Sequence, residues 1–208
     1  GNIEQVSVLA ERISQSFIDF IEDGYDVITL TSSCALMMKY EWPLILPENK
    51  SVKLLSENTY DIDEYIVDIS KNEGLVDGIK PVDGGISLHL ACHSRAQNMG
   101  AKSNELLKLI PEADISIVER CSGHGGTFGV LTPTHDLARK VGKPAARQVA
   151  KADPSFVISS CPLASKHLSQ ITKEDVIKGN EKSQIKSGHP IELMAVSYGF
   201  LNKDEMSE

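Results

Sequence analysis

The chain has no long apolar segment and no concentrated positive charge. No apolar run approaches the roughly 20 residues needed to span a bilayer, and Glu4, Glu11 and Arg12 exclude the pattern of a signal peptide. The formal net charge is -8 and the pI is near 5.3. Nucleic acid is therefore not an expected partner, because phosphate binding requires a concentrated basic face. These absences predict a cytoplasmic protein without a transmembrane segment.

The sequence also lacks the cysteine density of a disulfide-bonded secreted domain and the closely spaced cysteine pairs of a zinc ribbon. Four cysteines are spread over the 208 residues, and cysteines so placed are expected to be reduced thiols or metal ligands. Two nucleotide-binding patterns are missing as well, the Gly-Lys-Ser/Thr ending of a P-loop and the complete glycine pattern of a dinucleotide fold. A nucleotide site is therefore not expected.

Apolar residues make up 41% of the chain, which is enough for one core or two smaller ones. From residue 85 onward, short β-branched or apolar runs alternate with helical patterns, as is typical of a doubly wound α/β domain with a parallel sheet. The predicted strands cover residues 26–31, 85–91, 114–119 and 155–159. The predicted helices cover residues 3–22, 35–42, 61–72, 97–110, 134–151, 162–170 and 190–200.

Each of the four cysteines, Cys34, Cys92, Cys121 and Cys161, comes just after a predicted strand. Because the carboxyl ends of parallel strands lie along one edge of a sheet, the sulfurs are expected to gather there. A soft metal or an iron–sulfur cluster suits such a set of thiolates. The alternative is that a cysteine is a small buried apolar residue, and this interpretation is preferred for Cys34 alone.

A glycine-rich loop, Ser122-Gly-His-Gly-Gly126, follows Cys121. Glycines allow backbone N–H groups to approach an anionic ligand, so Gly123, Gly125 and Gly126 are expected to donate to cluster sulfurs. The same loop would also suit phosphate.

Two histidines lie close to the cysteines, His93 and His124. Each is a candidate to ligate a metal, to donate to a sulfur or to transfer a proton. With either as the base, a single cysteine would form a catalytic thiol site, which is the enzyme alternative. His89 lies inside a predicted strand and is expected to be structural, whereas His135, His167 and His189 carry no signal.

A sequence pattern that occurs twice in the chain indicates two related units. Thr29-Leu-Thr-Ser-Ser-Cys34-Ala-Leu-Met and Ile158-Ser-Ser-Cys161-Pro-Leu-Ala each place a cysteine after a strand and before a helix. We expect residues 1–47 to be the carboxyl-terminal part of a first unit, residues 48–84 to be a connector with one helix, and residues 85–208 to be a complete second unit.

The segments His89 to Gly100, Glu119 to Gly129 and Ser160 to Ala164 together resemble the cysteine-rich, or CCG, domain found in subunits of heterodisulfide reductase and of anaerobic glycerol-3-phosphate dehydrogenase. The resemblance extends over essentially residues 1–200. It implies a parallel-sheet, Rossmann-like domain with the remnant of a preceding repeat. It also implies Cys92, Cys121 and Cys161 as ligands of an iron–sulfur cluster, expected to be [4Fe-4S] with zinc as the alternative.

Two positions depart from the family pattern. Arg120-Cys121 stands where the family has a Cys-Cys pair, and Ala164 stands where it has the second cysteine of Cys-x-x-Cys. The missing ligand would be Cys34, His93, His124 or a residue outside this sequence. Arg95 or Arg120 would offset the negative charge of the cluster.

The resemblance further implies electron relay between a dehydrogenase or ferredoxin-like partner subunit and a quinone or disulfide acceptor. Such a protein would be a component of an iron–sulfur oxidoreductase, cytoplasmic or peripheral at the inner membrane through its partners. The competing hypothesis is a non-redox assembly scaffold in which the cysteines hold structural zinc or nothing.

Overall fold

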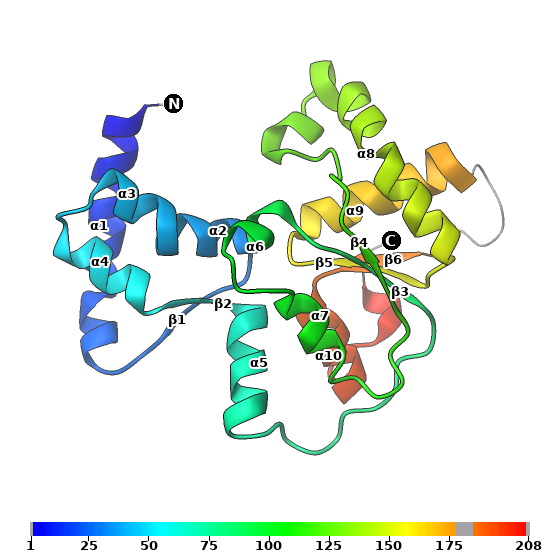
Figure 1. Cartoon of the computed structure of the whole chain (residues 1–208), viewed down its shortest axis with the longest axis horizontal. Helices are drawn as coiled ribbons and strands as arrows, with labels where there is room; N and C mark the ends of the chain where they lie inside the picture. The colour runs from blue at the N-terminus through cyan, green and yellow to red at the C-terminus, as the bar shows by residue number, and fades with distance from the viewer. Residues whose placement is uncertain (1, 178–184, 207–208) are drawn as a thin grey trace.

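The computed structural model of the protein describes residues 2–177 and 185–206. It shows a smaller amino-terminal unit beside a larger carboxyl-terminal unit (Figure 1), each built on a parallel sheet. The predicted α/β fold class with parallel strands is therefore confirmed. Within the described ranges, no helix is long and apolar enough to cross a bilayer.

The larger unit contains a four-stranded sheet in the order β4-β3-β5-β6, with every neighbouring pair parallel. The strands predicted here are confirmed, although each is slightly shorter than its apolar run. β6 was missed, because its three residues have no β-branched or aromatic pattern. The bounds are β3 Ile86–His89, β4 Ile115–Val118, β5 Phe156–Ser159 and β6 Lys186–Gly188.

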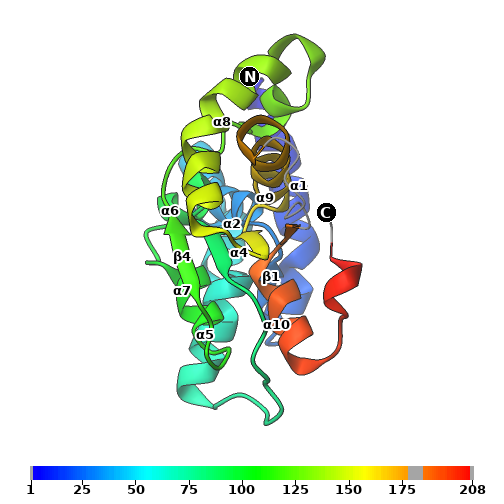
Figure 2. The ribbon, with the colours of Figure 1, turned by 90° about the vertical axis from the view of Figure 1, so that its right-hand side faces the viewer.

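Helices cover both faces of this sheet (Figures 1 and 2). On one face, α8 (Thr132–Ala152) and α9 (Pro162–Ile171) pack around a core that includes Val149, Val157 and Leu168. On the other face, α7 (Lys102–Leu107) and α10 (Pro190–Tyr198) pack around a larger apolar core. The buried members of that core include Ile86, Leu88, Leu106, Leu107, Phe156, Ile158 and Leu193. Burial on both faces explains why β5 has three consecutive apolar residues, Phe156, Val157 and Ile158, rather than an alternating pattern.

The smaller unit contains only two strands, β1 (Val27–Thr29) and β2 (Thr59–Asp61), which pair in parallel. α1 (Ile3–Glu22) and α4 (Lys50–Glu57) pack together beside them around a core of their own. The buried residues of that core are Ala10, Ile21, Trp42, Val52 and Leu55. α5 (Ile62–Asn72) follows β2 and places Val67 in the core of the larger unit.

Residues 48–84 contain two helices and a strand, whereas a connector with one helix was expected. α4 is amphipathic but only eight residues long, and β2 has only three residues, so both are difficult to recognise from the sequence. β2 is held by pairing with β1, which is distant in sequence.

The two units share one order of elements. A long helix (α1 or α8) precedes a strand with a Val-Ile-Thr or Val-Ile-Ser sequence (β1 or β5). In each unit the strand is followed by a turn that contains a serine and a cysteine, and then by helical structure. A second strand comes next and pairs in parallel with the first, as β2 pairs with β1 and β6 with β5. This second strand leads into α5 in the smaller unit and into α10 in the larger one. The sequence pattern that occurs twice thus lies in two segments with the same order of elements.

The helix predicted over residues 35–42 does not end before Pro43. Helical structure begins earlier, at α2 (Ser32–Leu36), passes through a π-helical turn, η1 (Met37–Glu41), and continues in α3 (Trp42–Ile45). Pro43 lies inside this helical run, directly after the π-helical turn, so one backbone N–H donor is missing there, and the run ends soon afterwards at Ile45.

The single helix predicted over residues 97–110 was also wrong. The structure has two short helices, α6 (Cys92–Ala96) and α7, separated by a break. Asn98 and Gly100 have positive φ angles of 54° and 81°, a left-handed conformation that a helix cannot include. The remaining single turns are η2 (Gly126–Gly129), η3 (Thr172–Ile177) and η4 (Lys203–Glu205).

Candidate functional site

Strand register brings three cysteine turns to one edge of the four-stranded sheet. His89, the last residue of β3, lies opposite Val118 at the end of β4 and Ser159 at the end of β5. Cys92 begins α6 just after β3, Cys161 is the N-cap of α9 just after β5, and Cys121 follows β4. Because the three strands are adjacent and parallel, their turns lie side by side at the carboxyl edge.

The turn that bears Cys34 joins this edge from the other sheet. The Ser32 N–H group donates to the Ser160 carbonyl at 3.5 Å, which links the two serine turns that precede Cys34 and Cys161. α2, which contains Cys34, also packs against α6, which begins at Cys92. The structure therefore places Cys34 close to the second-unit cysteines, although its sequence position associates it with the first unit.

Gln97 reinforces the contact between the two units. Its buried side-chain Nε2 group donates to the Ser32 carbonyl at 3.3 Å and to Asp61 Oδ2 at 3.0 Å. The backbone carbonyl of Gln97 accepts a hydrogen bond from the Tyr40 hydroxyl at 3.1 Å. Sequence reasoning missed this network. No local signal could have found it, because it joins residues that are far apart in the chain.

All four cysteines are free thiols. Cys92 and Cys121 are exposed, and Cys34 and Cys161 are partly exposed, so none is the buried apolar residue that was preferred for Cys34. Within residues 2–177 and 185–206, no three or more His, Cys, Asp and Glu side chains are arranged so as to hold a metal ion. The cysteines thus share an edge without forming an assembled ligand set.

The glycine loop after Cys121 has two separate roles. The Gly123 N–H group donates to the Cys121 sulfur at 3.3 Å, as expected of a loop that supports a thiolate. Gly123 has a φ of 79°, and a Cβ there would overlap the Ala138 carbonyl of α8. A Cβ on Gly142 would likewise overlap the Ser122 carbonyl. The glycine at position 123 is therefore required for close packing of the loop on α8, which sequence reasoning did not foresee.

Gly125 and Gly126 adopt left-handed conformations, with φ angles of 54° and 61°. No atom lies within 4 Å of the position where a Cβ on Gly126 would be, so only its backbone angle favours glycine. Both residues are exposed.

His124 is buried in a group of three imidazoles that the sequence did not reveal. Its ring centroid lies 5.9 Å from that of His167, which is 6.0 Å from that of His135. Burial lowers the pKa of His124 and is the main cause of the lowered pKa of His167, so both rings are neutral at pH 7. Their Nε2 atoms find no hydrogen-bond partner in the described part of the chain.

The remaining candidates lie on or under the cysteine edge. His93 and Arg120 are exposed, and the exposed Arg95 reaches from α6 to the Glu119 carbonyl at the end of β4, at 3.4 Å. His89 is buried in β3 with its Nδ1 3.1 Å from the Ser159 hydroxyl. Burial lowers its pKa to about 4, so the ring is neutral, in keeping with the structural role that was expected.

Residues 86–168 match the family model of the cysteine-rich domain, CCG. This part of the chain is similar to the CCG domain. It contains Cys92, Cys121 and Cys161, whereas Cys34 precedes it. The three strand-end turns described above thus lie within the matched segment.

Several curated proteins resemble longer stretches of the chain. A fumarate reductase (CoM/CoB) subunit of Methanothermobacter marburgensis is 27% identical over 95% of this chain and 37% of its own length. An iron-sulfur protein of Methanocaldococcus jannaschii is 30% identical over 68% of this chain and 26% of its own. Lactate utilization protein A of Bacillus cereus is 28% identical over 60% of this chain and 54% of its own. The chain therefore spans between a quarter and just over half of these relatives.

Proposed function

We propose that the cysteine edge of the CCG domain binds an iron–sulfur cluster and that the protein transfers electrons within a larger oxidoreductase. The observation that carries the proposal is the placement of all four cysteine turns at one edge, by the register of β4, β3 and β5 and by the hydrogen bond from Ser32 to Ser160. The names of the relatives, a reductase and an iron-sulfur protein among them, support it.

In this proposal the thiolates of Cys92, Cys121 and Cys161 hold the cluster, and Cys34 is the fourth ligand. Four thiolates suit a [4Fe-4S] cluster. Accessible free thiols and the N–H group of Gly123 at the Cys121 sulfur fit that group chemically. Because no ligand set is assembled in the described residues, binding would have to draw the cysteine turns together, which couples the cluster to local folding.

The cluster would supply one-electron transfer, and the protein would set its surroundings. Arg95 and Arg120, both exposed near the ends of β3 and β4, would offset the negative charge of the thiolates. The exposure of Cys92 and Cys121 would leave the edge open to a partner. We propose a dehydrogenase or ferredoxin-like subunit as that partner and a quinone or disulfide as the acceptor, with any membrane association arising through these partners.

The test is anaerobic isolation of the protein followed by iron and acid-labile sulfide analysis, visible absorption and electron paramagnetic resonance. We expect about four iron atoms per chain, and we expect Cys92→Ser, Cys121→Ser and Cys161→Ser each to remove most of the iron and the visible absorption. Bound zinc, or no metal after reconstitution with iron and sulfide, would contradict the proposal and favour the assembly scaffold.

A second comparison tests the fourth ligand. Cys34→Ser is expected to lower the iron content and change the resonance signal, whereas His93→Ala and His124→Ala leave both unchanged. If the resonance signal is unchanged in Cys34→Ser and changed in one of the histidine variants, that histidine is the fourth ligand instead of Cys34.

A further inference from the structure

Three histidines of the larger unit meet inside the protein, although each comes from a different segment. His124 lies in the loop after Cys121, His135 lies on α8, and His167 lies on α9. The His167 ring is the middle one, with its centroid 5.9 Å from that of His124 and 6.0 Å from that of His135. His124 and His167 are each only 5% exposed. The three rings thus connect the glycine loop to α8 and α9.

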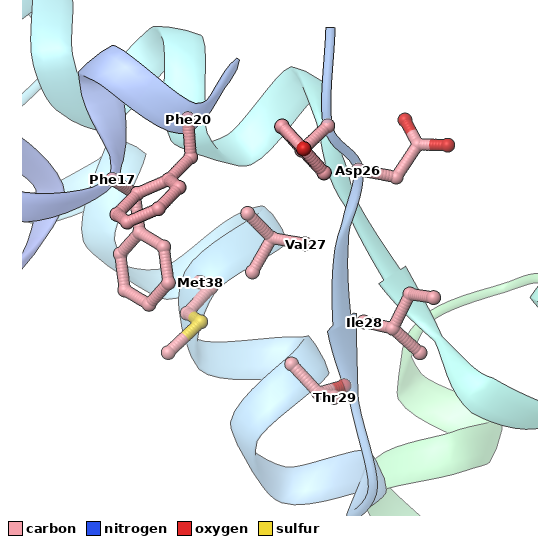
Figure 3. A pocket seen from close by; sticks show the side chains of 8 residues that line it. Phe17, Phe20, Asp26, Val27, Ile28, Thr29 and Met38 are labelled. Atoms are coloured by element: carbon pink, nitrogen blue, oxygen red, sulfur yellow. The ribbon is translucent and has the colours of Figure 1, made fainter. Parts of the chain in front are cut away.

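The enclosure of these rings contrasts with the pocket along β1. In that pocket Val27 points toward Phe17, Phe20 and Met38 (Figure 3), and Phe20 is 59% exposed. The residues that line it belong to the smaller unit. The imidazoles are surrounded instead by η2, α8 and α9 of the larger unit. A charge taken up by a buried ring is therefore not hydrated as it would be in the open pocket.

Hydrogen bonds to backbone carbonyls fix where two of the ring protons lie. A carbonyl oxygen only accepts, so His135 Nδ1 donates to the Gly129 carbonyl at 2.7 Å. The His167 ring donates in the same way to the Ala138 carbonyl of α8. Within the described ranges Nε2 of His167 has no partner, so Nδ1 is the donor and Nε2 keeps a free electron pair. Nε2 is thus the atom of His167 that would accept a further proton.

A proton on that nitrogen would be poorly accommodated. As the described residues are placed, the new N–H group would have no acceptor, and Nε2 of the neighbouring His124 is also buried without a partner. A buried polar group without a partner costs free energy, and a buried charge costs more. Burial accordingly lowers the pKa of His167, opposed by the hydrogen bond to Ala138 and reinforced by His124, His135 and Arg139.

The acidic groups close to α9 are engaged by cations of α8. η3, which packs on both α8 and α9, brings Glu174 and Asp175. Arg139 pairs with Glu174 Oε2 and with Asp175 Oδ1, both at 2.8 Å, and Lys143 lies 3.7 Å from Asp175 Oδ2. Of the strands packed on α9, β5 has no titratable side chain and β6 brings Lys186. A positive charge on His167 would therefore be added to existing cations.

The same contacts hold the glycine loop on α8. The Ala138 carbonyl, which accepts from His167, is also the atom closest to where a Cβ on Gly123 would be. A Cβ on Gly129 would lie 2.7 Å from Nδ1 of His124, so the imidazole fills the space that this glycine leaves. Displacing either ring would therefore disturb the packing of the loop.

We propose that His124, His135 and His167 form an acid-sensitive link, in which protons taken from solvent by these rings release residues 122–129 from α8 and α9. In the released loop the rings would be hydrated and would regain a pKa of about 6.5. The closed loop is therefore fully favoured above about pH 6.5 and loses stability as the pH falls below that value. Release would also free the Cys121 turn, whose sulfur accepts from the Gly123 N–H group. The link does not depend on an iron–sulfur cluster.

The test is amide hydrogen exchange of the full chain between pH 5 and pH 7, read by NMR and corrected for the intrinsic exchange rate. A reducing agent and a chelator keep the cysteine edge free of disulfides and metal. The amides to follow are those of Phe128, Val130 and Leu131, which donate to the carbonyls of Gly125 and Thr127. Their protection is expected to fall by up to about tenfold per pH unit below pH 6.5 for each proton that opening takes up.

His167→Asn tests the middle ring. Asparagine takes up no proton in this range, and its side-chain amide can still donate to the Ala138 carbonyl. In this variant the loss of protection is expected to shrink to about threefold or less per pH unit. His189→Asn is the matched control, because His189 is also buried and its Nδ1 accepts from the Ile191 N–H group at 3.2 Å, a role that the asparagine oxygen can fill. The control should keep the full pH dependence of the loop.

Three results would overturn the proposal. The first is the same corrected protection of the loop at pH 5 and pH 7. The second is an equal pH dependence in the native chain and in His167→Asn. The third is loss of that dependence in His189→Asn, which would trace it to global stability. If His167→Asn fails to fold, NMR titration of the ring protons of the native chain replaces it. The rings of His124 and His167 should then titrate together with the loop amides, and separate transitions would contradict the proposal.

Discussion

The two units use one order of elements but bury their strands to different extents. In the larger unit, Val157 and Ile158 of β5 are fully buried between two helical layers and two neighbouring strands. In the smaller unit, the matching Val27 and Ile28 of β1 are partly exposed, with Ile28 39% exposed. Similar strand sequences therefore have different environments. Two parallel strands with one helical layer cannot cover both faces and both edges.

The smaller unit compensates through its contact with the larger one. α5 places Val67 in the larger core, and Lys102 of α7 pairs with Asp68 at 3.1 Å. The buried Asp63 carboxylate accepts a hydrogen bond from Ser103, also of α7. The stability of the first unit is thus expected to depend on the second more than the reverse.

The difference in burial between β5 and β1 is tested most directly by making the same substitution in both strands. Ile158→Ala leaves a cavity in a closed core and is expected to lower the free energy of unfolding by about 4 kcal/mol. Ile28→Ala truncates a partly exposed side chain and should cost about 1 kcal/mol or less. Urea denaturation followed by circular dichroism measures both. Equal costs would mean that β1 is buried in solution.

A second pair compares two glycines of one loop. Gly123→Ala combines a left-handed backbone with overlap against α8 and is expected to destabilise the protein by about 3 kcal/mol. Gly126→Ala, the matched control, has space for the methyl group and should cost about 1 kcal/mol for the backbone angle alone. Thermal denaturation of the two variants checks the difference, and similar midpoints would show that the loop does not pack on α8.

The last comparison is at the junction of the units and varies the pH. Burial raises the pKa of Asp63 to about 7, opposed by the hydrogen bond from Ser103. The folded state therefore binds a proton that the unfolded state has lost, between about pH 4 and pH 7. This contribution to stability is fully present below about pH 4 and is lost as the pH rises through 7, with a slope of at most about 1.4 kcal/mol per pH unit.

Asp63→Asn removes the titration while keeping the shape of the side chain. Its free energy of unfolding, measured between pH 5 and pH 8, is expected to depend less on pH than that of the native protein. The variant should therefore become more stable relative to the native protein as the pH rises toward 8. Parallel pH profiles for the two proteins would show that Asp63 keeps an ordinary pKa.

Much of the fold could be predicted from the sequence, because its signals are local. The strands around Ile28, Leu88, Ile117 and Ile158 are short apolar runs bounded by polar residues, and all four exist. The start of α10 at Pro190 also follows from the preference of proline for the first helical turn. The break after α6 was missed although Asn98 and Gly100 are residue types that favour the left-handed conformation and helix ends.

The site was predicted less completely. The sequence indicated that the cysteines follow strands and offered Cys34 as one candidate fourth ligand. It did not show how the Cys34 turn would reach the others, since the hydrogen bond from Ser32 to Ser160 joins residues that are distant in the chain. It singled out Gly123 for ligand approach, whereas packing against α8 requires the glycine. His167 carried no signal, because its contact with His124 depends on how α9 lies against the loop.

The sequence by itself determined most of the longer helices, four of the strands, and that a cysteine follows each of those four strands, because these are properties of short stretches. Only the tertiary structure decided which strands are neighbours and that Asp63 is buried at the junction. Those outcomes depend on pairing and burial between residues far apart in the chain, and local propensity does not encode them.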